Sequence, residues 1–134
     1  LNDGMGDYVA SEIVKCMIKK SIPVNEAKIL ILGITFKENC PDIRNTKVVD
    51  LVNALKEYGT NITIHDPWAD EEEVMHAYGL ESLRSVPDKE FDAVVLTVSH
   101  NKFKKLDFIS LKNGEGTIYD VKNFLPDNVV DGRL

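Results

Sequence analysis

The sequence predicts an α/β domain with a doubly wound, mostly parallel, Rossmann-like sheet, preceded by a long N-terminal helix. Short apolar runs rich in β-branched residues alternate along the chain with segments of helical periodicity. Strands separated by helices imply parallel βαβ units with right-handed crossovers. The 134 residues are enough for one domain with a sizeable core, and the sequence has no internal repeat, low-complexity segment or long linker.

The first predicted element is a helix over about residues 5–20. Its apolar residues recur at helical spacing, at Met5, Val9, Ile13, Cys16 and Met17. Val14 and Ile18 widen the apolar surface beyond one stripe. The pattern therefore fits a helix packed wholly on its own sheet, and it fits equally a helix shared with another domain or subunit.

The other elements follow in order. We expect strands at 28–32, 61–65, 93–98 and 117–120, a short edge strand at Val129 and Val130, and helices at 47–58 and 70–78. Asn45 or Thr46 can cap the start of helix 47–58, and Gly59 can supply the positive-φ residue after its end. Helix 70–78 has acidic residues in its first turn and should stop near Gly79.

Composition and charge exclude several function classes. The net charge of −6 argues against nucleic-acid or anionic-membrane partners, because both need a basic footprint. No apolar run is long enough for a membrane span, and no pattern marks a signal peptide. Cys16 and Cys40 lack metal-ligand spacing and are too few for a disulfide framework, so a reducing, cytoplasmic compartment fits best.

The loop after the first strand is the leading candidate site. The apolar run ends at Gly33, and the loop then carries Lys37, Asp42 and Arg44 before the next helix. Ligands of open α/β sheets bind beyond the carboxyl ends of the strands, so these charges indicate an anionic, for example phosphorylated, ligand. Lys122 follows the strand at 117–120 and can converge with Lys37 if the strand order allows it. On spacing alone, a solvated loop whose charges only aid solubility is the somewhat better explanation.

Two phosphate-binding fingerprints are missing from the sequence. The first strand ends in a single glycine, Gly33, and not in G-x-G-x-x-G, the turn that lets a backbone approach a dinucleotide pyrophosphate. A G-x-x-x-x-G-K-[ST] phosphate loop is also absent. The chain is therefore not expected to be a principal dinucleotide-binding module.

Other polar residues are better explained by structure than by chemistry. Asp66 stands where dinucleotide folds carry a ribose-binding carboxylate, but its H-D-P-W context favours a turn. The acidic run at 70–73 fits a solvated helix start better than a metal site, and Cys40 has no neighbouring base that would make it a nucleophile. The histidines lack ligand spacing, so we assign no metal to His65, His76 and His100.

Three motifs, in order along the chain, resemble the UDP-glucose/GDP-mannose dehydrogenase family. The pattern G-x-x-F-K-x-x-x-x-D-x-R-x-[ST] at 33–46 resembles the family's C-terminal domain. N-D-x-M followed by Y-V, at 2–9, resembles its long central helix, and Y-D-V-K-N at 119–123 resembles its last substrate-binding loop. The sequences of residues 36–50 and of H-D-P-W-A at 65–69 are most similar to the branch of the family that acts on UDP-N-acetylhexosamines, including enzymes of the Vi-antigen type.

The resemblance implies chemistry that this chain holds only in part. The family oxidises the C6 alcohol of a nucleotide sugar to the carboxylate in NAD-dependent hydride transfers through a cysteine-bound intermediate, in polysaccharide biosynthesis. The main NAD domain and the nucleophilic cysteine would precede Leu1, and a chain that opens without Met agrees with a fragment. Residues 1–22 would then be the end of a central connecting and dimerisation helix, through which the protein forms a homodimer. Residues 23–134 would be the nucleotide-sugar-binding domain.

The resemblance also implies roles for individual residues. Phe36 and Lys37 would contact the UDP-sugar, and Arg44 would reach NAD held by the missing domain. Lys122 falls where many relatives carry a substrate-binding arginine, so the charge is kept but the planar bidentate fork is lost. The family's catalytic residues would all lie outside this chain, and no metal is implied.

Two other interpretations remain open from the sequence. The chain fits a free-standing module that binds a nucleotide or mediates assembly without catalysis. It also fits, less well, a complete small enzyme that uses Cys40.

Overall fold

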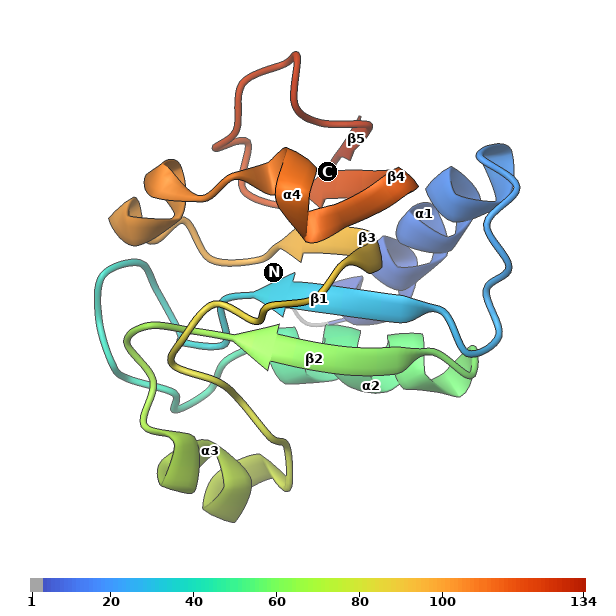
Figure 1. The fold of residues 1–134 in the computed structure, drawn as a ribbon. Coiled ribbons are helices and arrows are strands. Elements are labelled where there is room, and N and C mark those ends of the chain that lie inside the picture. The colour runs from blue at the N-terminus through green and yellow to red at the C-terminus, as the bar shows by residue number, and fades with distance from the viewer. Residues whose placement is uncertain (1–3) are drawn as a thin grey trace.

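A five-stranded parallel sheet organises residues 4–134, the part of the chain that this computed structural model describes (Figure 1). Leu1, Asn2 and Asp3 lie outside the described residues, and Asn2 and Asp3 are the first two residues of the N-D-x-M motif. The strand order is β2-β1-β3-β4-β5, and every neighbouring pair is parallel. The strands are β1 (Lys28–Leu32), β2 (Asn61–His65), β3 (Phe91–Leu96), β4 (Lys112–Asp120) and β5 (Gly132–Arg133). The predicted α/β class with a parallel sheet is confirmed.

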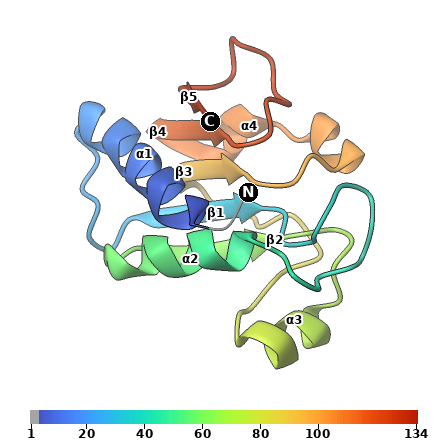
Figure 2. The same ribbon diagram turned by 180° about the vertical axis from the view of Figure 1, so that it is seen from behind.

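Helices cover both faces of this sheet. The helices are α1 (Met5–Lys19), α2 (Val48–Glu57), α3 (Glu71–Tyr78), the 3₁₀ helix η1 (Asn101–Lys105) and α4 (Phe108–Leu111). Figure 2 shows α1 and α2 side by side on one face, and α4 lies on the opposite face in Figure 1. Among residues 4–134, no helix is long and apolar enough to cross a bilayer.

Strand alternation divides the core into two layers. In β1, Ile29 and Ile31 join the layer under α1 and α2, whereas Leu30 and Leu32 join the layer on the other face. This is the period-2 alternation of a strand that is buried on both faces. Central parallel strands need such apolar side chains on both sides, which is why the run K-I-L-I-L forms a strand here.

Helix α1 packs on its own domain but leaves part of its apolar surface uncovered. Val9, Ile13 and Met17 are fully buried against the sheet and α2. Tyr8 and Ile18 on the same helix remain 53% and 61% exposed. The apolar stripe that the sequence predicts is therefore buried within the domain, whereas Tyr8 and Ile18, which lie beyond that stripe, remain exposed.

The predicted bounds hold well for the early elements. The strands at 28–32 and 61–65 have the predicted bounds, and the helices begin and end within one residue of those expected. Helix α2 has Lys47 as its N-cap residue, while the Thr46 hydroxyl accepts a hydrogen bond from the Val48 N–H at 3.3 Å. Gly59 has φ 85° after the end of α2, and Asp70 caps α3 by accepting from the Glu72 and Glu73 N–H groups.

The later strands differ from the prediction. β3 spans 91–96 and not 93–98, and β4 begins at Lys112, well before the predicted start at 117. The segment Asn113–Gly116 is polar and glycine-rich, so nothing local marks it as a strand. This segment becomes part of β4 because Lys112 pairs with Phe91 of β3. The register then shifts before Ala93 pairs with Thr117.

The predicted edge strand at Val129 and Val130 is wrong. Both valines pack partly buried against the second core layer, and the edge strand forms at Gly132 and Arg133 instead. The Ile118 N–H donates to the Asp131 carboxylate at 2.8 Å, and this bond sets the register that pairs Tyr119 with Gly132. Hydrophobicity at 129–130 therefore reports core packing and not strand pairing.

Candidate functional site

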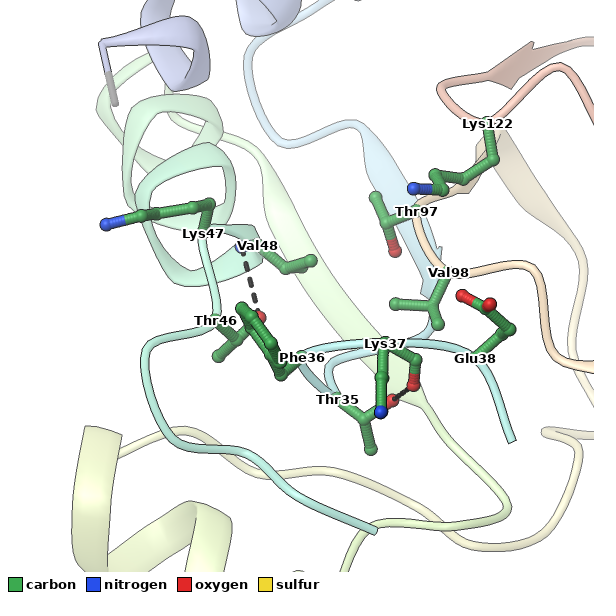
Figure 3. A pocket seen from close by; sticks show the side chains of 10 residues that line it. All are labelled: Thr35, Phe36, Lys37, Glu38, Thr46, Lys47, Val48, Thr97, Val98 and Lys122. Atoms are coloured by element: carbon green, nitrogen blue, oxygen red, sulfur yellow. Dashed lines mark hydrogen bonds between the residues drawn. The ribbon is translucent and has the colours of Figure 1, made fainter. Parts of the chain in front are cut away.

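A small pocket lies where the sheet changes its winding direction. The strand order places β1 and β3 side by side, with β2 beyond β1 and β4 beyond β3. Open α/β sheets bind ligands in the crevice outside such a switch point. The pocket there has a volume of about 60 Å³ and is lined by residues 35–38 after β1, 46–48 at the start of α2, 97–98 after β3, and Lys122 after β4 (Figure 3).

Three of the four site residues proposed from the sequence line this pocket. Phe36, Lys37 and Lys122 contribute to its wall, whereas Arg44 does not. β3 lies between the strands that carry the two lysine loops, so these loops are not direct neighbours, yet they reach one pocket. In Figure 3 the ammonium group of Lys122 points toward Thr97, while that of Lys47 points away from the other lining residues.

The pocket combines positive charge with one carboxylate. Lys37 and Lys122 each bring a cation, and α2 begins at the pocket wall with Thr46, Lys47 and Val48. The first turn of a helix carries the positive end of the helix dipole, although the Val48 N–H is already bonded to the Thr46 hydroxyl at 3.3 Å. Glu38 lines the same pocket, so the wall can also accept hydrogen bonds from hydroxyl groups. This arrangement suits an anion that carries hydroxyl groups.

A single glycine permits the close approach of the loops around the pocket. Gly33 has φ 107°, and a Cβ atom there would lie 2.5 Å from the Val98 Cβ. Thr97 also joins the ends of β3 and β1, because its hydroxyl can donate to the carbonyl oxygens of Leu32, at 2.9 Å, and Gly33, at 2.6 Å. The lone glycine thus has a packing role between two strand ends.

Arg44 lies outside the pocket in an exposed ion pair. Its Nε and Nη2 groups donate to the Asp42 carboxylate, both at 3.0 Å, and its side chain is 85% exposed. The hydrogen bonds from Arg44 lower the pKa of Asp42 to about 2, and the same contact raises the pKa of Arg44. A guanidinium has five N–H donors. Asp42 occupies one edge of the fork, and among residues 4–134 the Nη1 edge remains available to another anion.

Asp66 is a buried structural tie, which confirms the turn interpretation. Its Oδ1 accepts from the N–H groups of Trp68 and Ala69 at 2.7 and 3.1 Å, closing the turn after β2. Its Oδ2 accepts from the N–H groups of Ile34 and Thr35 at 2.8 and 3.2 Å. The carboxylate, 1% exposed, therefore joins the end of β2 to the start of the Lys37 loop.

Asp120 has the same role for the Lys122 loop. This fully buried carboxylate accepts from the N–H groups of Lys122, Phe124 and Leu125 at 2.7–2.9 Å. Arg133 completes the arrangement, because its guanidinium donates to Asp120 at 2.9 Å and to Asp127 at 2.8 Å. Sequence reasoning missed Arg133, since the contact spans the whole C-terminal segment and no motif contains it.

The remaining residues weighed from the sequence do not join the pocket. Cys40 is half-buried and does not line it, and the acidic run at 70–73 is exposed at the start of α3. His65 and His100 are buried, and His76 is exposed. Within residues 4–134, no three His, Cys, Asp or Glu side chains are grouped so that they could hold a metal ion.

Comparison with known proteins agrees with the geometry. The family model for the UDP-glucose/GDP-mannose dehydrogenase family, UDP binding domain, matches residues 30–127. The whole chain is 44% identical to UDP-N-acetyl-D-glucosamine 6-dehydrogenases from Pseudomonas aeruginosa and Salmonella typhi, and it covers 32% of each. The chain thus spans a minor, domain-sized part of these relatives.

A solved structure shows the same fold. An NDP-N-acetyl-D-galactosaminuronic acid dehydrogenase from Methanosarcina mazei has a TM-score of 0.75 and 18% identity, over 94% of this chain and 29% of that one. The family match covers the first-strand loop, the switch-point pocket and the Lys122 loop together. This chain therefore belongs to the UDP-glucose/GDP-mannose dehydrogenase family, as its UDP-binding domain.

Proposed function

We propose that this chain is the substrate-binding part of an NAD-dependent nucleotide-sugar 6-dehydrogenase. The full protein would oxidise the C6 alcohol of a UDP-N-acetylhexosamine, UDP-N-acetylglucosamine or UDP-N-acetylgalactosamine, to the uronate. The observation that carries the proposal is the convergence of Phe36, Lys37 and Lys122 on one pocket at the switch point of the sheet. The identity of 44% to two UDP-N-acetyl-D-glucosamine 6-dehydrogenases supports the substrate class.

The pocket chemistry suits a sugar nucleotide. Lys37 and Lys122, with the start of α2, would meet the diphosphate, because both cations and a helix N-terminus favour negative charge. Glu38 would accept hydrogen bonds from hydroxyl groups of the ligand. The Phe36 ring, 56% exposed at the pocket wall, offers an apolar surface that a bound ligand would cover.

The size of the pocket supports a shared binding site. Its volume of about 60 Å³ is far below the roughly 300–1,000 Å³ of pockets that enclose whole ligands. A UDP-sugar would therefore be only partly enclosed by this domain and would contact the N-terminal and central regions of the same protein as well. NAD and the nucleophilic cysteine would be supplied by those regions.

Arg44 would face the cofactor and not the sugar. It lies outside the pocket with one edge of its guanidinium held by Asp42 and the Nη1 edge free to bind an anion. Such an exposed, oriented fork suits a phosphate of NAD bound on the other domain.

Helix α1 would belong to the connecting region, with the division near residue 22. Tyr8 and Ile18 remain exposed after α1 has packed on its own sheet, which supports a second contact surface on this helix. We propose that this surface makes the protein a homo-oligomer.

Substitution of Lys37 in the full-length protein tests the proposal. Lys37→Ala removes a charge-assisted contact worth about 1.5–3 kcal/mol, so kcat/KM for the UDP-sugar should fall roughly ten- to a hundredfold. Lys89→Ala, which removes the same charge just before the amino end of β3, is the matched control and should leave kcat/KM unchanged. Measured NADH formation decides the outcome. A soluble, folded Lys37→Ala enzyme with wild-type kinetics would return the loop to a role in solubility.

The alternative, a nucleotide-binding or assembly module without catalysis, has a separate test. The dehydrogenase proposal requires a dinucleotide fingerprint and a nucleophilic cysteine upstream in the parent gene. A parent sequence without them would favour the non-catalytic module.

A further inference from the structure

We propose that His100 is a positioning residue that holds Lys37 in place for the ligand. The inference rests on the proposed function of Lys37 in nucleotide-sugar binding. His100 lies 65 residues beyond Thr35 in sequence, yet its imidazole contacts the Lys37 loop on both sides of the lysine.

Packing fixes the orientation of the imidazole ring. His100 follows β3 as the N-cap residue of η1, and its side chain is fully buried. The Phe103 ring meets it edge-on with centroids 5.2 Å apart, and the Trp68 ring lies 6.4 Å away. A fully buried ring does not reach a bound ligand, so its role is to position other groups and not to react.

The contact with Asn39 determines the tautomer of His100. The Asn39 N–H donates to Nδ1 at 2.8 Å, so Nδ1 is an acceptor and carries no proton. The neutral ring therefore carries its proton on Nε2, because a neutral imidazole has one donor and one acceptor nitrogen.

The Nε2–H group contacts the Lys37 loop on the other side of the lysine. It lies 3.0 Å from Asp66 Oδ2 and 3.1 Å from Thr35 Oγ1. The Thr35 hydroxyl donates its hydrogen to the Lys37 carbonyl oxygen at 2.9 Å, so the hydroxyl oxygen accepts from His100. A chain of hydrogen bonds thus runs from the imidazole through Thr35 to the backbone of Lys37.

The two contacts bracket the lysine. Thr35 and Asn39 each stand two residues from Lys37, and both are held by the same ring. Asn39 adds a second tie, because its Oδ1 accepts from the Asn101 N–H at 2.8 Å. The exposed Lys37 therefore stands on a loop whose ends are bonded to residues 100–101. Ordering the loop before the ligand arrives reduces the entropy that binding would otherwise lose.

Two substitutions of His100 separate its two nitrogens. His100→Gln can place an amide donor near the Nε2 position and keep the bond to Asp66, but it offers nothing to the Asn39 N–H. His100→Asn can place an oxygen near the Nδ1 position and keep the bond to Asn39. In the full-length enzyme, we expect His100→Gln to raise KM for the UDP-sugar about five- to tenfold, the effect of roughly one hydrogen bond, with kcat nearly unchanged. His100→Asn loses the contacts of Nε2 with Asp66 and Thr35 and should raise KM at least as much.

The same measurement in a Lys37→Ala background distinguishes positioning from general stability. If His100 acts through Lys37, His100→Gln should have little further effect once Lys37 is gone. An equal loss of kcat/KM with and without Lys37 would overturn the inference. If Lys37→Ala itself is silent, the proposed function fails and this inference fails with it. If Lys37→Ala is damaging and His100→Gln is silent, only this inference fails.

An exposed residue provides a variant that keeps the core intact. Asn39→Gly retains the positive φ of 56° and the backbone N–H, and it removes only the bond from Oδ1 to the Asn101 N–H. Asn45→Gly is the matched control, because Asn45 is exposed in the same loop with φ 58° and its side chain makes no hydrogen bond within residues 4–134. Asn39→Gly should raise KM about two- to fivefold, less than one full hydrogen bond, and Asn45→Gly should not. Equal KM values for the two variants would contradict the bracketing of Lys37.

Discussion

Individual side chains at this site divide into exposed groups that can meet a ligand and buried groups that hold the loops. Lys37 and Lys122 are exposed at the pocket, whereas Asp66 and Asp120 are buried below it. Each carboxylate stands at the end of a strand and accepts several backbone N–H groups of the following loop. Buried carboxylates are stable only when they are hydrogen-bonded in this way, so their positions and the loop shapes depend on each other.

Asp66 should make stability depend on acid pH. Burial raises its pKa, but the hydrogen bonds from His100 and from the Ile34 and Trp68 N–H groups outweigh burial and hold the pKa below its ordinary value. Between the unfolded pKa, about 3.9, and the lower folded pKa, the unfolded state binds more protons. The stabilisation by Asp66 is therefore complete above about pH 4 to 5 and is lost as the pH falls through the folded pKa.

Denaturant unfolding of the Asp66→Asn variant measures this contribution. At pH 7 the variant should lose roughly 1.5–3 kcal/mol of unfolding free energy, because an amide cannot accept at both oxygen positions. The difference from wild type should shrink as the pH falls below about 4, where Asp66 of the unfolded wild-type chain begins to bind a proton. Asp88→Asn, in an exposed loop, is the control and should change little at any pH. A constant difference across the pH range would show that the charge of Asp66 does not matter.

Arg44 should serve the cofactor more than the sugar. Arg44→Lys keeps the charge and loses the planar fork, so bidentate binding to a phosphate should weaken while a simple electrostatic role survives. We expect the affinity of the full-length enzyme for NAD to fall while the affinity for the UDP-sugar stays the same. Titration of both ligands against wild type and variant decides between them. A fall confined to the UDP-sugar would assign Arg44 to the sugar site.

At the scale of elements, the chain reversal after α2 places β2 in register beside β1. Gly59 has φ 85°, and its carbonyl oxygen accepts from the Glu26 N–H at 2.7 Å, next to the start of β1. A Cβ at this position would collide with the side chain of Asn25. The turn is thus constrained both by its backbone conformation and by the segment that precedes β1.

Gly59→Ala should therefore destabilise the domain. A non-glycine residue at positive φ costs about 1–3 kcal/mol, and the exposed Asn25 side chain must rotate away from the new Cβ. Gly114→Ala is the control, because a Cβ there meets nothing within 4 Å, and it should change stability by less than about 0.5 kcal/mol. Thermal or denaturant unfolding of the two variants provides the comparison. Equal stability of both would mean that the turn relaxes freely.

For the whole molecule, the proposed division of labour predicts that this chain alone does not turn over substrate. Hydride transfer needs NAD held against the sugar, and the covalent step needs a positioned thiol. The purified 134-residue chain should form no NADH from UDP-N-acetylglucosamine or UDP-N-acetylgalactosamine, while the full-length protein should form it from at least one of them. Steady NADH production by the isolated chain would overturn this prediction and direct attention to Cys40.

The sequence alone determined the features that depend on neighbours along the chain. Alternating apolar residues predicted the bounds of β1 and β2, helical periodicity predicted α1, α2 and α3, and the loop motif predicted the edge of the sheet where Lys37 and Lys122 meet. These signals are local, because a strand or a helix repeats its burial pattern within a few residues.

Only the tertiary structure decided the features whose partners are distant. The first half of β4 is a strand because β3 pairs with it. The edge strand forms at Arg133, where Asp120 accepts a hydrogen bond from the Arg133 guanidinium. His100 carried no signal in the sequence, since its partners Asn39 and Asp66 lie 61 and 34 residues away. A buried polar group is stable only when it is paired, and which groups become partners is decided by packing and not by spacing along the chain.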